Sequence, residues 1–159
     1  MTGLFSASDT VDIKEKDANG RLVFLDGLFT MEYQNIAHRL VTPVDVSACV
    51  DGSPLFRMDA IWDTGATTSC ISEPIARKMG LLPIEKGVGV STTGQTDISY
   101  YLVDVSISPT VRVPNLKVGG FPMENHDGDF IVGMDIISKG KLCVESKGGA
   151  TGFSFEFNG

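Results

Sequence analysis

The 159-residue sequence contains no long hydrophobic run and no basic leader. No apolar stretch approaches the roughly 20 residues that a helix needs to cross a bilayer. The N-terminal segment does not place an apolar core behind a basic stretch, which is the organisation of a signal peptide. We therefore expect a cytoplasmic protein without a membrane partner.

Paired cysteines and clusters of basic residues are also missing. The three cysteines are odd in number and lie far apart, at positions 49, 70 and 143, which fits reduced thiols better than a disulfide framework or a zinc site. The formal net charge is -7 and no run of lysine and arginine occurs, whereas binding to a nucleic-acid backbone needs clustered positive charge. We expect no nucleic-acid partner, no metal and no cofactor.

What the sequence does contain is glycine and many short apolar segments. It has 18 glycines, and hydrophobic residues make up 42% of the chain, enough for one domain with a core. The apolar segments are rich in Val, Ile, Phe and Thr and alternate with polar residues, which indicates β-strands. Turn signals between such segments predict four hairpins, at Asn19-Gly20, Asp51-Gly52, Thr93-Gly94 and Gly148-Gly149.

One short helix is predicted after Ser72, the candidate N-cap. Pro74 lies in its first turn and Gly80 ends it. The fold class is therefore mostly β, a closed barrel or sandwich with one short helix. Residues 36–159 are expected to form the main domain, and residues 1–35 an N-terminal extension that is a pro-segment, an added hairpin or a docking arm.

The stretch AIWDTGATTSCIS, Ala60–Ser72, places a carboxylate directly after a run of apolar residues. Asp-Thr-Gly is good turn chemistry, because Asp caps a turn and Gly accepts a positive φ. The context favours a second interpretation. The apolar run up to Trp62 predicts the end of a buried strand, and the small residues after Asp63 predict a tight loop that holds the carboxylate beside a cavity.

A second apolar stretch, DFIVGMDIIS, runs from Asp129 to Ser138. By itself this stretch predicts a core strand. Gly133, inside the run, indicates a place where another backbone or side chain approaches closely.

Together the two stretches resemble the retropepsin-like family, the retroviral-type aspartic proteases. The family's first motif is present as Ile61–Ala66, and its second motif, apolar residues around a glycine and an acid, is present as Ile131–Ile137. Between them, Val88–Thr96 matches the position of the family's flap, a glycine-containing β-hairpin. The resemblance covers about residues 40–157 and implies a closed β-barrel with a flap.

The resemblance also implies an aspartic endopeptidase that works as a homodimer. Peptide hydrolysis without a metal or a covalent intermediate needs one group to accept a proton and another to donate one, and two close carboxylates do this by sharing a proton. The chain has no second Asp-Thr-Gly, so the other carboxylate would come from Asp63 of a second copy. The implied catalytic residues are Asp63, Thr64 and Gly65, and the implied contacts with a peptide or protein substrate are Ala66, Thr67, Val90, Ser91, Thr92, Thr93, Gly94, Ile131 and Val132.

The sequence departs from the retroviral pattern at two positions. Many retroviral relatives have an arginine after the glycine of the second motif and an acid just past the first motif, whereas this chain has Met134 and Thr67. Both members of that ion pair are absent together. The chain is in this respect more similar to cellular and bacterial members of the family.

Two alternatives stay open. A module that keeps the fold but no longer cleaves would serve as a dimeric binding or scaffold domain.

The second alternative concerns the last segment, where Phe153, Phe155 and Phe157 alternate and so share one strand face. That face either covers the domain's own core or contributes to the interface with a second copy.

Overall fold

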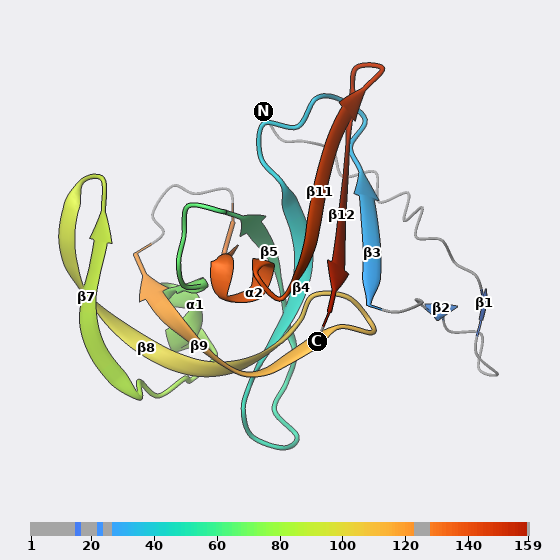
Figure 1. Cartoon of the computed structure of the whole chain (residues 1–159). Coiled ribbons are helices and arrows are strands. Elements are labelled where there is room, and N and C mark those ends of the chain that lie inside the picture. Colours follow the sequence, from blue (N-terminus) through green and yellow to red (C-terminus); the bar gives the residue numbers. More distant parts are fainter. Residues whose placement is uncertain (1–14, 17–21, 24–26, 123–127, 159) are drawn as a thin grey trace.

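The computed structural model describes residues 15–16, 22–23, 27–122 and 128–158 of the chain. This part of the chain is mostly β with two short helices, as Figure 1 shows. The elements are, in order, β1 (Glu15–Lys16), β2 (Leu22–Val23), β3 (Leu28–Glu32), β4 (Val41–Ala48), β5 (Phe56–Trp62), β6 (Cys70–Ser72), α1 (Glu73–Lys78), β7 (Glu85–Ser91), β8 (Gly94–Ser106), β9 (Arg112–Phe121), β10 (Phe130–Val132), α2 (Met134–Ile137), β11 (Gly140–Lys147) and β12 (Ala150–Phe157). Neither of these helices is long and apolar enough to span a bilayer.

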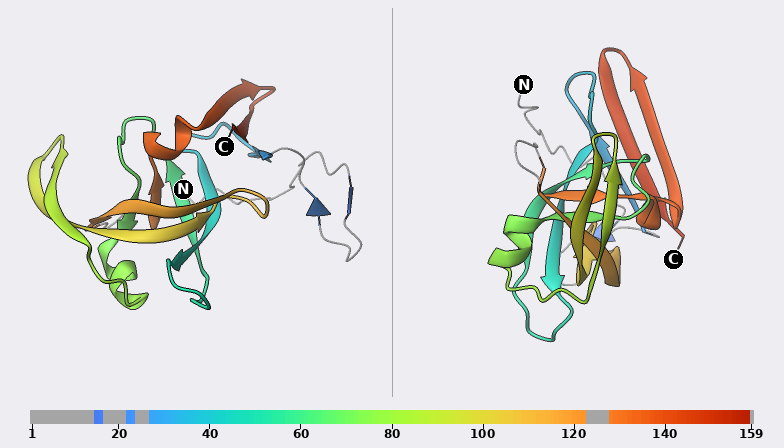
Figure 2. Two further views of the ribbon diagram at one scale, coloured as in Figure 1. Left: turned by 60° about the horizontal axis from the view of Figure 1, so that its bottom comes forward. Right: turned by 90° about the vertical axis from the view of Figure 1, so that its left-hand side faces the viewer.

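Six strands form a closed ring in the described part of the chain. Their order is β4-β5-β10-β6-β9-β8, and β8 pairs back with β4, so that the ring closes on itself. β10 runs parallel to β5 and β6 runs parallel to β9, while the other neighbours are antiparallel. Figure 2 shows the ring from two further sides, with the β7–β8 hairpin projecting beyond it. The predicted mostly β fold is confirmed.

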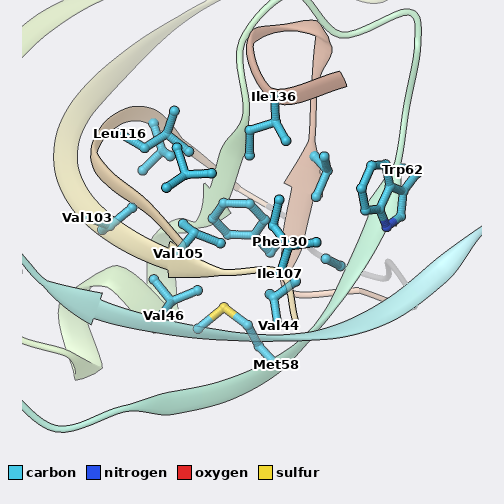
Figure 3. Close-up of a cluster of buried hydrophobic side chains, with 14 of the residues drawn as sticks. Val44, Val46, Met58, Trp62, Val103, Val105, Ile107, Leu116, Phe130 and Ile136 are labelled. Atoms are coloured by element: carbon cyan, nitrogen blue, oxygen red, sulfur yellow. The ribbon is translucent and has the colours of Figure 1, made fainter. Parts of the chain in front are cut away.

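The core lies inside this ring, as Figure 3 shows. Val44 and Val46 of β4 are buried at alternate positions, and so are Val103 and Val105 of β8; all four belong to one cluster with Phe130 of β10. Successive side chains of a strand point to opposite faces, so an alternating pattern makes one face of the strand apolar. Burying that face stabilises the domain by about 25 cal/mol for each Å² of apolar surface removed from water.

A separate three-stranded sheet, in the order β11-β12-β3, covers one side of the core. Phe153 and Phe155 of β12 are 2% and 0% exposed, and the ring centroid of each lies 5.0 Å from that of Trp62. The phenylalanines of the last strand therefore cover the domain's own core, which decides between the two alternatives for that face. Gly148 and Gly149 form the turn before β12 with φ of 62° and 80°, as the predicted hairpin requires.

β3 lies within the range predicted as an N-terminal extension. It pairs with β12, and its residues Phe29 and Met31 are buried in the core. β1 and β2 pair with each other in antiparallel fashion, while the turn predicted at Asn19-Gly20 lies outside the described residues. The division of the chain at residue 35 stays a prediction, but β3 packs as part of the main domain.

The two helices follow the segments that carry the two motifs. α1 begins after Ser72, as predicted, with Pro74 in its first turn. The sequence pattern does not predict α2. The core strand expected over Asp129–Ser138 ends at Val132, because the chain turns at Gly133 into a short helix.

Candidate active site

Asp63 directly follows β5, whose end is fixed by main-chain hydrogen bonds. The N–H of Asp63 donates to the carbonyl of Val132 in β10 at 3.0 Å, and the N–H of Trp62 donates to the carbonyl of Leu40 at 2.9 Å. The indole of Trp62 is itself anchored, since Nε1 donates to Oγ1 of Thr42 at 2.8 Å. Trp62 is thus a buried anchor at the end of the strand, and Asp63 is the first residue that leaves the core.

Asp63 is exposed in the single chain and opens a turn. Its Oδ1 accepts a hydrogen bond from the N–H of Gly65 at 2.8 Å, and its carbonyl accepts one from the N–H of Ala66 at 3.2 Å. A Cβ at position 65 would lie 3.1 Å from Oδ1, so glycine gives the carboxylate its room. Asp63 therefore caps the turn, as Asp-Thr-Gly predicts, and no hydrogen bond from the described residues engages its second carboxylate oxygen.

The second motif lies directly against residues 63–69, which we call the Asp63 loop. The N–H of Met134 donates to the carbonyl of Ala66 at 2.8 Å, and the N–H of Asp135 donates to the carbonyl of Thr67 at 3.2 Å. A Cβ at Gly133 would lie between 2.8 and 3.0 Å from three main-chain atoms of the Asp63 loop. The close approach predicted at this glycine is confirmed, and the two motifs form one hydrogen-bonded unit.

Asp135 ties this unit together through its side chain. Its two carboxylate oxygens accept hydrogen bonds from the N–H and the hydroxyl of Ser69, at 2.8 and 2.6 Å. The hydroxyl of Ser69, which is fully buried, accepts the N–H of Gly133 at 3.0 Å. The sequence shows Asp135 only as a member of the second motif. An acid inside an apolar run indicates a carboxylate that needs hydrogen-bond donors. Here both donors belong to Ser69 at the end of the Asp63 loop, and only folding brings them close to Asp135.

Comparison with known proteins agrees with this geometry. A family model described as aspartyl protease matches residues 46–136, a range that includes Asp63 and the glycine and acid of the second motif. The chain belongs to the aspartyl protease family.

Two solved structures are similar to this aspartyl protease. One is the protease of simian foamy virus (mac), at 18% identity over 61% of this chain and 92% of that chain, with a TM-score of 0.40. The other is a retropepsin-like aspartic protease from Rickettsia conorii, at 14% identity over 77% of this chain and 98% of that chain, with a TM-score of 0.42. No curated protein matches the chain.

The hairpin predicted as a flap in this aspartyl protease is β7–β8. A two-residue turn joins the strands, and Gly94 follows it with a φ of 130°. Figures 1 and 2 show the hairpin as an arm that projects beyond the ring. In the described part of the chain, β7 pairs only with β8, and no hydrogen bond joins the tip to the Asp63 loop. The predicted substrate contacts at the tip are all exposed: Val90, Ser91, Thr92, Thr93 and Gly94.

The other predicted substrate contacts divide between the Asp63 loop and the core. Ala66 is half-buried and Thr67 is exposed, both in the same loop as Asp63. Ile131 of β10 is half-buried, whereas Val132 is 0% exposed. Val132 supports Asp63 through its carbonyl, and in the single chain its side chain belongs to the core.

Cys70 directly follows the Asp63 loop of the aspartyl protease and begins β6. Its sulfur, Ile98 and Tyr100 surround Gly119, where an added Cβ would lie 3.4 to 3.7 Å from all three side chains. Burial raises the pKa of the Cys70 thiol to about 11, and the negative charge of Asp135 adds to the shift. Cys70 is therefore a neutral thiol that packs as a small apolar side chain.

A hollow of about 520 Å³ lies elsewhere, beside the β4–β5 turn. Cys49, Asp104, Arg112 and Asn115 are among the residues that line it, and none of the predicted site residues does. Asp104 is already engaged there, because it accepts the N–H of Asn115 at 2.8 Å and pairs with Arg112. Among the residues that the structure describes, no group of three or more His, Cys, Asp or Glu side chains is placed to hold a metal ion.

Proposed function

We propose that the protein is an aspartic endopeptidase in which two Asp63 carboxylates, one from each of two copies of the chain, activate water. The observation that carries this proposal is the exposed carboxylate of Asp63 on a loop that is hydrogen-bonded to the second motif. The nearby Asp135 does not supply the second acid, because both of its oxygens accept hydrogen bonds from Ser69. The second carboxylate therefore comes from another copy.

Two carboxylates that meet across a two-fold axis share one proton, since both do not ionise readily at close range. The ionised group accepts a proton from water, and that water attacks the carbonyl carbon of the peptide bond. The protonated group donates its proton to the carbonyl oxygen, which gives a tetrahedral diol. The C–N bond of this diol then breaks as the dyad returns the proton taken from water to the leaving nitrogen and accepts a proton from one diol hydroxyl. The N–H of Gly65 holds Oδ1 of Asp63 at 2.8 Å, which fixes the plane of the carboxylate and leaves the other oxygen for water. The two groups titrate as a coupled pair.

The proposed substrate is an extended peptide with mainly apolar side chains. Extended peptides bind to strand edges through main-chain hydrogen bonds, and β7 has a free edge among the described strands. Val88 and Val90 of β7 are 53% and 77% exposed, so the hairpin has apolar side chains with which to cover a substrate when it closes as a flap. Thr64, exposed beside Asp63, would hydrogen-bond to its counterpart across the axis.

The test compares cleavage of a fluorogenic peptide library by the wild type, Asp63→Asn and Asp51→Asn. Asp51 is an exposed acid in the β4–β5 turn, so it is a matched control for the loss of one charge. We expect Asp63→Asn to lose at least about 100-fold in kcat/KM, a common scale for acid–base catalysis, and Asp51→Asn to keep the wild-type value. Equal residual cleavage by the wild type and Asp63→Asn would contradict the catalytic role and favour the non-cleaving dimeric module.

The need for two copies has its own measurement. Specific activity should fall on dilution, because the dimer dissociates. An excess of Asp63→Asn added to the wild type should also suppress activity, because mixed dimers contain a single carboxylate. Specific activity that is constant at all dilutions and unaffected by the variant would show that one copy is sufficient.

A further inference from the structure

The β7–β8 hairpin is attached to the rest of the described structure at its root. The pairing of β8 with β9 begins at Tyr100, which lies opposite Gly119, and on its other side Tyr100 lies opposite Glu85, the first residue of β7. Over residues 94–99, β8 pairs with β7 alone among the described strands, so the hairpin continues as the two-stranded arm of Figures 1 and 2. A two-stranded hairpin by itself is marginally stable in water. Contacts at the root therefore decide the direction in which the arm points.

Main-chain hydrogen bonds connect this root to the Asp63 loop. The carbonyl of Ser69, the last residue of the loop, accepts the N–H of Gly119 at 3.0 Å. The carbonyl of Tyr100 accepts the N–H of Ile84, just before β7, at 2.8 Å. Since Gly119 and Tyr100 lie opposite each other, one cross-strand pair separates the Asp63 loop from the start of the hairpin. The position of the arm relative to Asp63 is therefore set at this root.

The ring of Tyr100 lies against the main chain of both neighbouring strands. A Cβ added at Gly87 of β7 would lie 2.8 Å from Cε2 of the ring, and a Cβ added at Gly119 of β9 would lie 3.7 Å from Cε1. The ring has this place because neither glycine has a side chain that competes for the space. The ring of Tyr100 therefore contacts all three strands that meet at the root.

One ammonium group joins the two outer strands across this ring. Lys117 of β9 lies two residues before Gly119 and so points to the same face of the sheet as Tyr100. Its Nζ lies 4.5 Å from the centroid of the Tyr100 ring, within the range of a cation–π contact. The same Nζ forms an ion pair with the carboxylate of Glu85 in β7. Side chains therefore link β7 to β9, which are not neighbours in the described sheet. We call Glu85, Tyr100 and Lys117 the root clasp.

We propose that the root clasp positions the flap: it restricts the arm to orientations from which the tip closes over Asp63. The proposal rests on the function proposed above, in which this hairpin covers the substrate. None of the three residues is among the predicted substrate contacts, so they are positioning residues that act through the hairpin. An arm that is less restricted loses more conformational freedom when it closes, and substrate binding has to compensate for that loss. Loosening the clasp should therefore raise KM and leave kcat nearly unchanged.

Hydrogen exchange measures the arm directly and needs no substrate. All proteins in this experiment carry Asp63→Asn, so that cleavage does not affect the outcome. Lys117→Met removes the ammonium group and keeps an unbranched side chain. We expect the amides of residues 87–98 to exchange about three- to tenfold faster, the scale of one exposed ion pair together with one exposed cation–π contact.

Lys86→Met is the matched control, because it removes the same charge from an exposed position of β7 that points to the other face. It should leave the exchange rates of the arm within about twofold. The amides of Val103 and Val105, where β8 also pairs with β4, should exchange equally in all proteins. Equal exchange of the arm in Lys117→Met and Lys86→Met overturns the proposal. A rise of the same factor at Val103 and Val105 also overturns it, because the clasp would then stabilise the domain as a whole.

A second pair of variants tests the ring. Tyr100→Phe keeps the ring and should keep the exchange rates of the arm, whereas Tyr100→Leu removes the ring and should raise them as Lys117→Met does. Equal rates in the Phe and Leu variants overturn the role of the ring. Glu85 and Lys117 have side chains that are 54% and 44% exposed, so Glu85→Gln and Lys117→Met test the clasp even if Tyr100→Leu does not fold.

Cleavage of a fluorogenic peptide by proteins that keep Asp63 separates positioning from stability. Lys117→Met should raise KM about three- to tenfold, by the factor seen in exchange, with kcat within about twofold of the wild type. Lys86→Met should keep both wild-type values. An unchanged KM in Lys117→Met overturns the positioning role. Exchange that behaves as expected in a protein whose wild type cleaves no peptide contradicts the proposed activity and leaves the restriction of the arm by the clasp supported.

Discussion

Replacing Gly133 with alanine tests whether contact between the two motifs holds the Asp63 loop. The main chain at Gly133 has φ −95° and ψ −172°, an extended conformation that alanine adopts without strain, so the substitution adds only a methyl group. That Cβ would lie 2.8 Å from the carbonyl carbon of Thr68, 2.9 Å from the carbonyl oxygen of Ala66 and 3.0 Å from the nitrogen of Ser69. Non-bonded carbon atoms prefer a separation of about 3.5–4.0 Å, so the main chain has to move.

The magnitude follows from what this movement disturbs. The bonds from the N–H of Met134 to the carbonyl of Ala66, at 2.8 Å, and from the N–H of Gly133 to the hydroxyl of Ser69, at 3.0 Å, lie at the contact. Overpacking lowers the free energy of unfolding by about 1–3 kcal/mol, and each weakened hydrogen bond lowers it by about 0.5–1.5 kcal/mol more. Alanine also makes the unfolded chain stiffer than glycine does, which offsets about 0.4–1 kcal/mol of this loss. We expect the free energy of unfolding to fall by about 2–4 kcal/mol. Peptide cleavage should fall as well, because the loop that carries Asp63 is displaced.

Urea unfolding followed by circular dichroism measures the free energy of unfolding. Gly152→Ala is the matched control, because its added Cβ would approach only the carbonyl oxygen of Glu145, at 3.9 Å. The control should stay within about 0.5 kcal/mol of the wild type. If Gly133→Ala unfolds at the same urea concentration as Gly152→Ala, with the same slope, the steric argument is refuted.

Two further predictions concern titrating groups. The hydrogen bond from Arg57 lowers the pKa of Asp45 below its ordinary 3.8, so the pair stabilises the fold above that pH and the effect disappears as the pH falls through the lower folded pKa. Arg57→Gln should therefore cost no more than about 1 kcal/mol at pH 7, since the pair is exposed, and progressively less as the pH is lowered below 3.8. A loss in urea unfolding that stays the same at pH 7 and in acid contradicts this. The pKa of about 11 keeps the Cys70 thiol protonated at pH 8, so iodoacetamide should label the exposed Cys143 well before Cys70. Mass spectrometry of partly labelled protein measures the order, and equal rates would show that Cys70 is accessible and ionised.

The hairpin turns show what local chemistry is sufficient to predict. Gly52 and the pair Gly148-Gly149 stand where the sequence pattern places turns, with φ of 78°, 62° and 80°. The ability to adopt a positive φ is a property of glycine itself, because glycine has no Cβ that would clash with the main chain. The close approach at Gly133 was predictable for a related reason. A glycine inside an apolar run has no side chain, so it leaves room for another segment to come close.

α2 shows where such reasoning fails. The run that contains Met134–Ile137 has the composition of a core strand, yet these residues are helical. Asp135 accepts the two donors of Ser69 and also the N–H of Ile136 at 3.0 Å. The bonds to Ser69 exist only after the Asp63 loop has folded against this segment. Tertiary contacts of this kind override local propensity.

The sequence by itself determined the mostly β class, the position of Asp63 at the end of an apolar strand, and the two motifs that identify the family. These features can be recognised one segment at a time, from alternation, turn residues and short motifs. Only the tertiary structure decided that the C-terminal phenylalanines cover the core and that Asp135 holds Ser69. Both outcomes depend on partners that are distant in the chain: Phe153 packs against Trp62, and Asp135 accepts a hydrogen bond from Ser69. Packing brings such partners together, and no local pattern specifies it.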